Sequence, residues 1–479
     1  MKKEICDKKM EFADCELAIL RHAVDNAENK QGRQIISSPD IKKIITIVEK
    51  FIQTNKLLCY GGTAINNILP KQDQFYNKDI EIPDYDFYSP NALNDVKKLA
   101  DIYLEEGFFE VEAKSGVHHG TYKVFVNFIA VADITQLPSE LFNTLKKQSI
   151  VVAGIFYVPA NFLRMSMYLE LSRPSGDVSR WEKVLKRLTL LNKHHKLTSQ
   201  SCDKIQYQRH MSNDKNAGQI FDVVKKSFID QGVVFFGGYA ISKYAEYFPH
   251  NIKSQLSKTP DFDVLSEEPT ITAEIIKEQL MQIGIKNIKI IKRPNIGEIV
   301  AVNYEIIVDK DTIAFIYEPL ACHSYNIIHE HGMSIKIATI DTMLSFYLAF
   351  LYSNRPYYDP NRILCMSKYL FDVQAKHRLS QKGLLKRFSI NCFGHQPTLE
   401  EMRAEKAEKF KQFKNDINNP AYEEWFLRYR PSELVNNNTN THSLSIKKIK
   451  KNPSKKNPSK KTKKKPSKKT LKHFFNLHL

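Results

Sequence analysis

The sequence predicts an α/β (α+β) fold in which two copies of one domain follow each other, each with a mixed sheet and flanking helices. Two observations support this prediction. An apolar stretch, a Gly-Gly turn and a helical pattern appear in LCYGGTAINN and return in VVFFGGYAIS. Each copy then continues into an apolar segment with two aspartates, PDYD in the first and PDFD in the second. Self-similarity of this length indicates a duplicated structural unit.

Length, charge and cysteine content limit the class of protein. The 479 residues suffice for two or three domains, and the absence of a long apolar run or a signal peptide predicts a soluble intracellular protein. The net charge is +18, but the residues from Val435 onward hold 14 Lys and no Asp or Glu, which leaves about +4 for the rest. The seven Cys form no CxxC motif, so we expect reduced thiols rather than disulfides or a zinc site.

Residues 1–55 are predicted to form a helical segment without catalytic residues. Apolar residues recur at helical spacing over Glu11–Asn26 and over Ser38–Asn55. We expect both helices to pack on the domain that follows.

Residues 56–195 form the first copy, which we interpret as the catalytic domain. The Gly-Gly-Thr turn at residues 61–63 opens a helix after a buried strand, where backbone amides can face a phosphate. Asp84 and Asp86 are spaced i, i+2 and therefore lie on one face of a strand. Two neighbouring carboxylates repel each other and favour a divalent cation between them.

A third carboxylate lies in the apolar run Tyr122–Ile134, which is rich in β-branched and aromatic residues and is predicted to be one buried strand. A lone carboxylate such as Asp133 is costly there unless it is paired or binds a metal. On a strand adjacent to Asp84 and Asp86, Asp133 would complete a triad that suits two metal ions.

Two helices after the triad carry cations that could reach a triphosphate. Arg164 lies on the helix predicted from Pro159 to Leu171, and a guanidinium binds phosphate through two hydrogen bonds. A structural ion pair is the alternative role. On the next, basic helix, Lys183, Lys186 and Arg187 share one face. We assign Lys183 to the nucleotide, with a solvated helix face as the alternative.

Residues 214–385 form the second copy, in which the carboxylate set is incomplete. Asp261 and Asp263 match the first aspartate pair, but a gapless alignment of the two copies places Phe315 opposite Asp133. We therefore expect catalysis in the first copy. The second copy is interpreted as a degenerate partner used for packing or RNA.

The chain ends in a helical extension, residues 386–432, and a low-complexity tail, residues 433–479, which is predicted to be disordered. Dense Lys attracts the RNA backbone without reading its sequence. A targeting or solubilising tail is the alternative. The tail lysines that we assign to RNA are Lys455, Lys456, Lys460, Lys461, Lys463, Lys464 and Lys465.

The apolar-Gly-Gly-Thr turn, the aspartate pair and the distant third aspartate resemble the DNA polymerase β-like nucleotidyltransferase superfamily. More narrowly, CYGGTAINN, IPDYDFYSP and the degenerate second copy resemble the poly(A) polymerase catalytic subunits of poxviruses and giant DNA viruses. The resemblance implies two tandem nucleotidyltransferase-like domains, two Mg²⁺ or Mn²⁺ ions, and ATP as substrate. The residues that it implies are Asp84, Asp86 and Asp133 for metal binding and catalysis, and Gly61, Gly62 and Thr63 for the nucleotide. The insert before Asp84 is longer than in the usual superfamily pattern, which affects loop geometry rather than chemistry.

The function predicted with this resemblance is template-independent addition of a poly(A) tail to the 3′ end of viral mRNA. The expected setting is the viral factory in the host cytoplasm, and the virion. The expected partners are the RNA 3′ end and ATP, together with a second copy of the chain or a viral processivity subunit, and no membrane. A CCA-adding enzyme could use the same triad, and an inert RNA-binding scaffold would require the triad to be inactive. Base specificity separates the two enzymes, and the intact triad argues against the scaffold.

Overall fold

The computed structural model describes residues 5–6, 9–199, 202, 205, 216–253, 256 and 260–433. The lysines predicted to bind RNA, from Lys455 to Lys465, lie outside the described residues. Within those described ranges, no helix is both long and apolar enough to cross a bilayer.

The first sheet has eight strands in the order β16-β3-β4-β5-β2-β1-β7-β6. It is mixed, because β1 pairs in parallel with β7 and β2 with β5, whereas the other neighbours are antiparallel. Its strands are β1 (Leu58–Cys59), β2 (Tyr85–Ser89), β3 (Val111–Ser115), β4 (Thr121–Val126), β5 (Ile129–Gln136), β6 (Ile150–Val152), β7 (Ile155–Tyr157) and β16 (Arg428–Tyr429).

The second sheet also has eight strands, in the order β10-β11-β12-β9-β8-β14-β13-β15. Its strands are β8 (Val234–Phe235), β9 (Phe262–Leu265), β10 (Ile288–Arg293), β11 (Asn303–Val308), β12 (Asp311–Tyr317), β13 (His323–Glu330), β14 (Met333–Ala338) and β15 (Cys392–Phe393). Apart from β16 and β15, the two sheets follow the same order, and the parallel pairs β9–β12 and β8–β14 match β2–β5 and β1–β7. The predicted fold class, with two mixed sheets, is confirmed.

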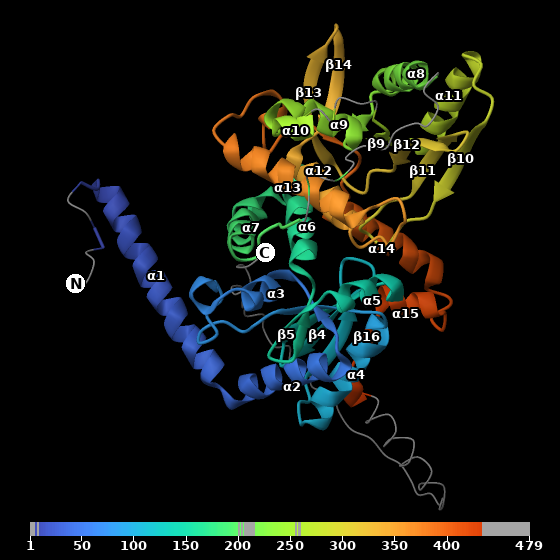
Figure 1. Cartoon of the computed structure of the whole chain (residues 1–479). Helices are drawn as coiled ribbons and strands as arrows, with labels where there is room; N and C mark the ends of the chain where they lie inside the picture. The colour runs from blue at the N-terminus through green and yellow to red at the C-terminus, as the bar shows by residue number, and fades with distance from the viewer. Residues whose placement is uncertain are drawn as a thin grey trace, which may run out of the picture. The chain divides into compact units, whose positions relative to one another are not determined.

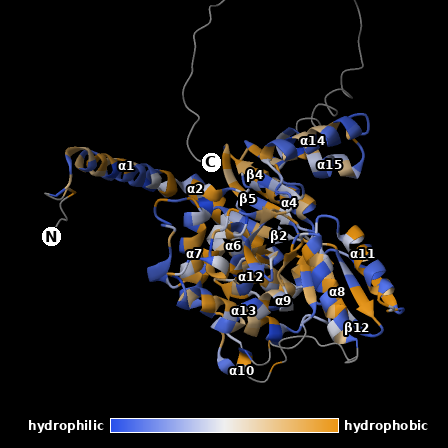
Figure 2. Ribbon diagram, turned by 90° about the horizontal axis from the view of Figure 1, so that it is seen from above, coloured by the Kyte–Doolittle hydropathy of each residue, from blue (hydrophilic) through white to orange (hydrophobic). Residues whose placement is uncertain are grey.

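Helices flank both sheets (Figure 1). They are α1 (Phe12–Ser37), α2 (Pro39–Asn55), α3 (Gly61–Ile68), α4 (Ala92–Glu105), α5 (Ser139–Lys147), α6 (Ala160–Leu171), α7 (Trp181–His194), α8 (Ala217–Asp230), α9 (Gly238–Lys243), α10 (His250–Lys253), α11 (Pro269–Gln282), α12 (Ile340–Phe350), α13 (Pro360–Lys376), α14 (Leu399–Phe413) and α15 (Pro420–Phe426). Corresponding helices of the two copies, α6 and α12, pack against each other, and α13 packs on α12 (Figure 2).

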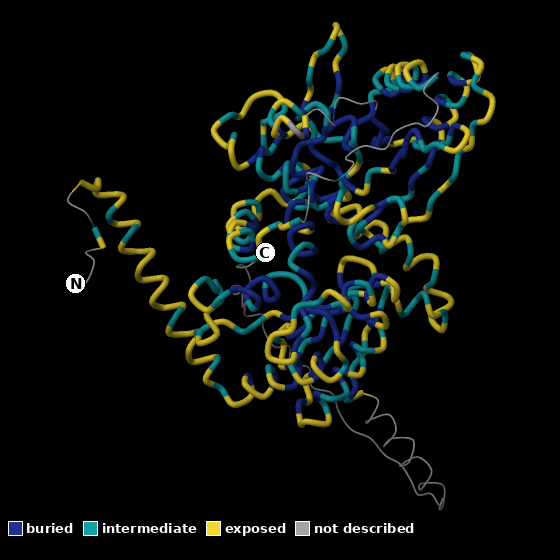
Figure 3. The backbone as a smooth tube through the Cα atoms, in the orientation of Figure 1, coloured by how far each residue is buried: buried dark blue, intermediate teal, exposed yellow. Residues whose placement is uncertain are grey.

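The N-terminal segment divides into a buried and an exposed helix. Ile44, Val48 and Phe51 of α2 recur at helical spacing and are buried in the core beside the first sheet. By contrast, α1 has no buried residue, and Figure 3 shows it as largely exposed chain. The expectation that both helices pack on the first domain therefore holds for α2 and is wrong for most of α1.

The run Tyr122–Ile134 was predicted to be one strand, but it forms a hairpin of two strands. β4 ends at Val126, and β5 begins at Ile129. The two residues between them, Asn127 and Phe128, have φ angles of +51° and +66°. A two-residue turn with positive φ at both positions matches the twist of antiparallel strands. The turn contains neither glycine nor proline, and the β-branched and aromatic residues on both sides of it concealed it.

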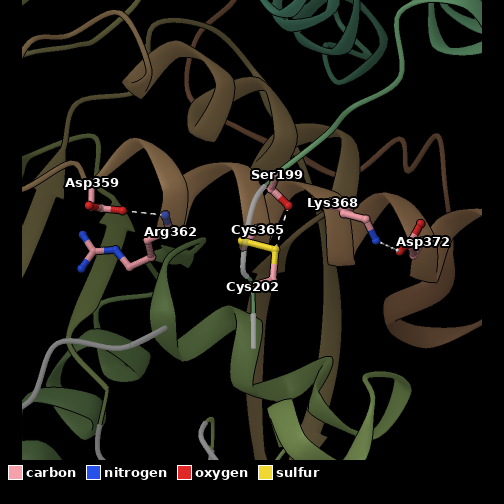
Figure 4. Close-up of a disulfide and its surroundings, with 7 residues drawn as sticks. All are labelled: Ser199, Cys202, Asp359, Arg362, Cys365, Lys368 and Asp372. Atoms are coloured by element: carbon pink, nitrogen blue, oxygen red, sulfur yellow. Dashed lines mark hydrogen bonds and ion pairs between the residues drawn. A yellow bond between two sulfur atoms is a disulfide. The ribbon is translucent and has the colours of Figure 1, made fainter. Parts of the chain in front are cut away.

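The prediction of reduced cysteines is contradicted. The structure pairs Cys6 with Cys15, Cys202 with Cys365 and Cys322 with Cys392, and leaves Cys59 as a free, buried thiol. Figure 4 shows the second pair, in which one cysteine lies on α13. Two of the pairs span 163 and 70 residues of sequence, so only the fold brings their Cα atoms to 5.5 and 5.1 Å.

Candidate active site

The turn between β1 and α3 lies directly against β2. Gly61 adopts a left-handed conformation, with φ +72°, and a Cβ atom at this position would collide with the carboxylate of Asp86. The amide of Tyr60 donates a hydrogen bond to the backbone oxygen of Asp86 at 2.9 Å. Glycine tolerates both the conformation and the close approach. The turn therefore brings the start of α3 up to the second aspartate.

Two neighbouring strands carry the three carboxylates. β2 and β5 are parallel, and their register places Asp86 directly opposite Asp133. Asp84 immediately precedes β2 and lies two positions before Asp86, on the same side of the chain. The register meets the expectation that Asp133 lies on the strand adjacent to the aspartate pair.

The carboxylates repel one another. Burial, together with the charges of Asp84 and Asp133, raises the pKa of Asp86 to about 7. Burial and then the charge of Asp133 raise the pKa of Asp84 above its ordinary value. Lys123 and Arg180 act on the pKa of Asp86 in the opposite direction, but more weakly. Such a set of carboxylates is stabilised by a bound cation.

Lys123 is a residue of this site that the sequence analysis missed. It lies opposite Asp133 in the β4–β5 register, and its ammonium forms an ion pair with that carboxylate. The Lys123 side chain is 38% exposed, so solvent reaches the pair. A correct hairpin prediction would have revealed Lys123, because the alternation of β4 then places it on the carboxylate face.

The donor set suits a divalent ion. Asp84, Asp86 and Asp133 supply oxygen ligands of the kind that Mg²⁺ prefers. In the described parts of the chain, however, no three His, Cys, Asp or Glu side chains are already grouped as the ligands of a metal. Asp133 is paired with Lys123 instead. Only the Oδ2 atom of Asp133 is in this ion pair, so its second oxygen remains available to an ion.

The predicted nucleotide contacts differ in their surroundings. The Thr63 side chain is buried, and its hydroxyl donates to the backbone oxygen of Asp84 at 2.5 Å, so it positions the first aspartate. Arg164 is fully buried, and its guanidinium donates to Asn192, at 2.7 Å, to Asn161 and to the backbone of His195. These bonds occupy the guanidinium inside the protein and favour a structural role for Arg164 over the predicted contact with a triphosphate.

Three cations, Arg180, Lys183 and Arg187, lie close to one another at the start of α7. Partial burial of the Lys183 ammonium, and then the neighbouring charges of Arg187 and Arg180, lower the pKa of Lys183. Lys183 itself is exposed. By contrast, Lys186 pairs with Glu182 of its own helix at 2.5 Å.

Arg187 is the member of this group that reaches the glycine turn. A Cβ atom at Gly62 would lie 2.9 Å from Arg187 Nη1 and 2.5 Å from the hydroxyl oxygen of Tyr76. Arg187 Nη2 donates to that hydroxyl at 2.7 Å, and the guanidinium lies over the rings of Phe75 and Tyr76 at 4.8 and 5.4 Å. The long insert between the glycines and the aspartates thus holds this arginine beside the turn. The sequence analysis placed Arg187 on the same helix face as Lys183, but it assigned only Lys183 as a nucleotide contact.

The corresponding position in the second copy is closed. β9 and β12 are parallel, and their register places Phe315 opposite Asp263, as the gapless alignment predicted. Gly237, Asp261 and Asp263 line a cavity of only about 40 Å³, which Arg362 of α13 also lines. A small-molecule site needs roughly 300 Å³ or more. This cavity has no room for a nucleotide.

The segment that carries this geometry also matches a known protein family by sequence. Residues 46–177 match the family model described as the poly(A) polymerase catalytic subunit. This segment contains the glycine turn and all three carboxylates, and it ends before α7 and its cations.

Viral relatives align over a similar length. A protein of African swine fever virus (strain Badajoz 1971 Vero-adapted), provisionally named a poly(A) polymerase catalytic subunit, is 32% identical over 162 residues, which are 33% of this chain and 34% of that protein. A protein of Acanthamoeba polyphaga mimivirus with the same provisional name is 31% identical over 158 residues, 32% of this chain and 26% of that protein. The aligned segment therefore spans about a third or less of these curated relatives.

The whole chain has a structural counterpart. The crystal structure of the Megavirus polyadenylate synthase superimposes with a TM-score of 0.76, covering 94% of this chain and 93% of that one, at 19% sequence identity. The likeness extends beyond the segment matched by sequence and shows that the two chains share one fold.

Proposed function

We propose that this chain is a template-independent polynucleotide adenylyltransferase that adds adenylate units from ATP to the 3′ end of RNA. One observation carries the proposal. The β2–β5 register places Asp133 opposite Asp86, beside Asp84 and the glycine turn, within the segment that matches poly(A) polymerase catalytic subunits.

The side chains divide the work of this reaction. Asp84, Asp86 and Asp133 would hold two Mg²⁺ or Mn²⁺ ions, which when bound would polarise the attacking hydroxyl and the triphosphate. Gly62 allows the triphosphate to approach the start of α3, and Arg187 binds its oxygens with Lys183. Lys123 balances the charge of Asp133 while no ion is held.

The chemical step is a substitution at phosphorus. The RNA 3′ oxygen forms a bond to the α-phosphorus of ATP, and the bond from that phosphorus to the bridging oxygen of the β-phosphate breaks. Pyrophosphate leaves with the electron pair of that bond, and the hydroxyl proton passes to water. The cations of α7, and the ions that the three carboxylates would hold, would stabilise the developing charge.

The test uses the purified full chain, a short labelled RNA, Mg²⁺ or Mn²⁺, and each nucleoside triphosphate separately. We expect long products with ATP alone. Asp84→Ala should abolish them while circular dichroism stays unchanged, and Asp79→Ala, an exposed carboxylate of the same insert, should retain them. A few additions with CTP would indicate a CCA-adding enzyme. RNA binding without incorporation of any nucleotide would indicate a scaffold.

We also propose that the chain acts in the viral factory of the host cytoplasm and is packaged in the virion, supported by its similarity to viral proteins. The length of the tails made by the purified chain, measured against its concentration, tests whether synthesis needs a second whole chain or a viral processivity subunit. Immunodetection in infected cells and in purified virions tests the location.

A further inference from the structure

A straight row of side chains crosses the first sheet from the carboxylates to its edge. Asp86 lies opposite Asp133, Asp133 opposite Lys123, Lys123 opposite Lys114, and Lys114 opposite Arg428. Neighbouring strands lie about 4.8 Å apart, so the row extends over about 19 Å. We call its three basic members, Lys123, Lys114 and Arg428, the cation row.

All members of the row lie on the same face of the sheet, because directly opposite residues on paired strands share a face. The residues next to them along the strands, Ala113, Val124 and Ala132, point the other way and are fully buried in the core. The cation row faces away from that core. The exposed fractions of its side chains rise from 38% for Lys123 to 45% for Lys114 and 71% for Arg428.

Acidic groups compensate only part of this charge. Besides Asp133, which pairs with Lys123, the acid that lies within ion-pair distance of the row among the described residues is Glu112. Lys114 lies 3.7 Å from Glu112, Arg428 lies 3.5 Å from it, and Arg430 lies 3.0 Å from it. The two outer members of the row, Lys114 and Arg428, therefore share one carboxylate, which leaves positive charge on the outer half of the row.

The outer end of the row comes from the far end of the described chain. β16, which carries Arg428, is held on β3 by the bond from the Ser115 amide to the Leu427 oxygen at 3.0 Å. The Ser115 hydroxyl also donates to the backbone oxygen of Trp425 at 2.8 Å. Lys406 of α14 donates to the Gly116 oxygen at 2.9 Å. A segment in which the sequence analysis saw no chemistry is therefore built into the catalytic sheet.

We propose that the cation row binds the backbone phosphates of the RNA strand behind its 3′ end and guides that end to the carboxylates. The proposal rests on the proposed function, since it extends the same site. A single-stranded nucleic acid fits this surface because exposed cations on a line attract successive phosphates without reading bases. The line also ends where the reacting hydroxyl is needed.

The test compares RNA binding by the full chain with binding by Lys114→Gln combined with Arg428→Gln. The matched control, Lys226→Gln with Lys277→Gln, removes two lysines of the second copy whose side chains are 73% and 37% exposed. Fluorescence anisotropy measures the Kd of a labelled single-stranded RNA of about ten nucleotides at several salt concentrations. We expect the row variant to bind on the order of tenfold more weakly, with a salt slope smaller by about 1.4, and the control to bind like wild type.

Two further binding measurements vary the length of the RNA and the charge of the substituted residues. A dinucleotide, which reaches only the carboxylate end of the row, should bind the wild type and the row variant equally. Lys114→Arg with Arg428→Lys keeps the charges and should restore binding of the longer RNA, which separates charge from packing if the glutamine variant folds poorly. Equal loss for both primer lengths, or weak binding by the charge-keeping variant, would overturn the proposal.

The two proposals fail separately. Normal RNA affinity of the glutamine variant, together with incorporation of ATP by the wild type, would eliminate the cation row and leave the function intact. A wild type that incorporates no nucleotide, but whose RNA binding depends on the row, would eliminate the function and keep the row. Binding of an acidic peptide in place of RNA would contradict the row as an RNA surface.

Discussion

Asp86 is held where its negative charge is unfavourable. Its pKa is about 7 in the folded chain, chiefly because of burial and then because of Asp84 and Asp133, against an ordinary value of 3.8. Between these two values the folded chain keeps a proton that the unfolded chain has lost. Stability therefore falls as the pH rises from about 4 to about 7.

We expect Asp86→Asn to stabilise the protein in the absence of divalent ions, because the amide cannot ionise. The gain should be on the order of 1–2 kcal/mol at pH 8, after allowance for partial exposure, and should vanish near pH 4. Thermal melting in a chelator across this pH range measures it. The control Asp25→Asn on the exposed helix α1 should show no such trend. A gain that is independent of pH would mean that removal of the charge is not the cause.

Arg187 illustrates how neighbouring residues on one helix face acquire different roles. Its guanidinium lies beside Gly62 and over Phe75, whereas Lys186 pairs with Glu182 in solvent. We expect Arg187→Ala to raise the KM for ATP at least tenfold, because a cation at the triphosphate is lost. Steady-state incorporation measures this change.

Lys186→Ala on the same helix is the control and should leave the KM for ATP within twofold of wild type. Arg187→Lys should recover only part of the affinity, since an ammonium cannot bind phosphate through a planar fork. Equal effects of the two alanine variants would show that α7 contributes only general charge.

At the scale of elements, the sequence prediction and the structure differ in the state of the cysteines: the first expects reduced thiols and the second contains three disulfides. Seven reduced cysteines would all react with iodoacetamide in denaturant without reductant, whereas the structure leaves only Cys59 to react. We therefore expect one alkylated thiol before reduction and seven after it, counted by mass spectrometry. Seven before reduction would show that the three pairs are proximities of reduced thiols.

Elements with a local sequence signal could be predicted, and elements defined by distant partners could not. The glycine turns, the aspartate strands and the loss of the third acid at Phe315 follow from the duplicated pattern. The β4–β5 hairpin escaped detection because its turn, Asn127 and Phe128, contains neither glycine nor proline. The strand β16 is two residues long and exists only through its pairing with β3, more than 300 positions earlier. No local pattern could reveal it.

The same limit applies to the candidate site. Asp84, Asp86 and Asp133 were found because carboxylates in apolar strands are conspicuous. Lys123 and Arg428 are ordinary surface cations in sequence, and only the strand register aligns them with the carboxylates. Arg164 was predicted to contact the triphosphate from its place on a helix. Its complete burial favours a structural role, and the sequence pattern does not reveal that burial.

At the scale of the whole described molecule, duplication has produced two similar sheets, of which the first carries the complete carboxylate triad. The copies pack through α6 and α12, and the amide of Ser324 donates to the Ser172 oxygen between them at 2.8 Å. In the second copy, Asp261 and Asp263 are retained but are buried around a cavity of about 40 Å³. The small volume of this cavity argues against a nucleotide in the second copy.

Catalysis should therefore depend on the first copy alone. We expect Asp263→Asn to keep ATP incorporation within twofold of wild type, since its cavity admits no nucleotide, whereas Asp86→Asn at the matching position should abolish it. Both substitutions preserve side-chain shape, and melting curves of each variant separate loss of chemistry from loss of folding. If a folded Asp263→Asn variant were as inactive as Asp86→Asn, the two copies would have to act together, and the substitution of Phe315 for the third acid would need another explanation.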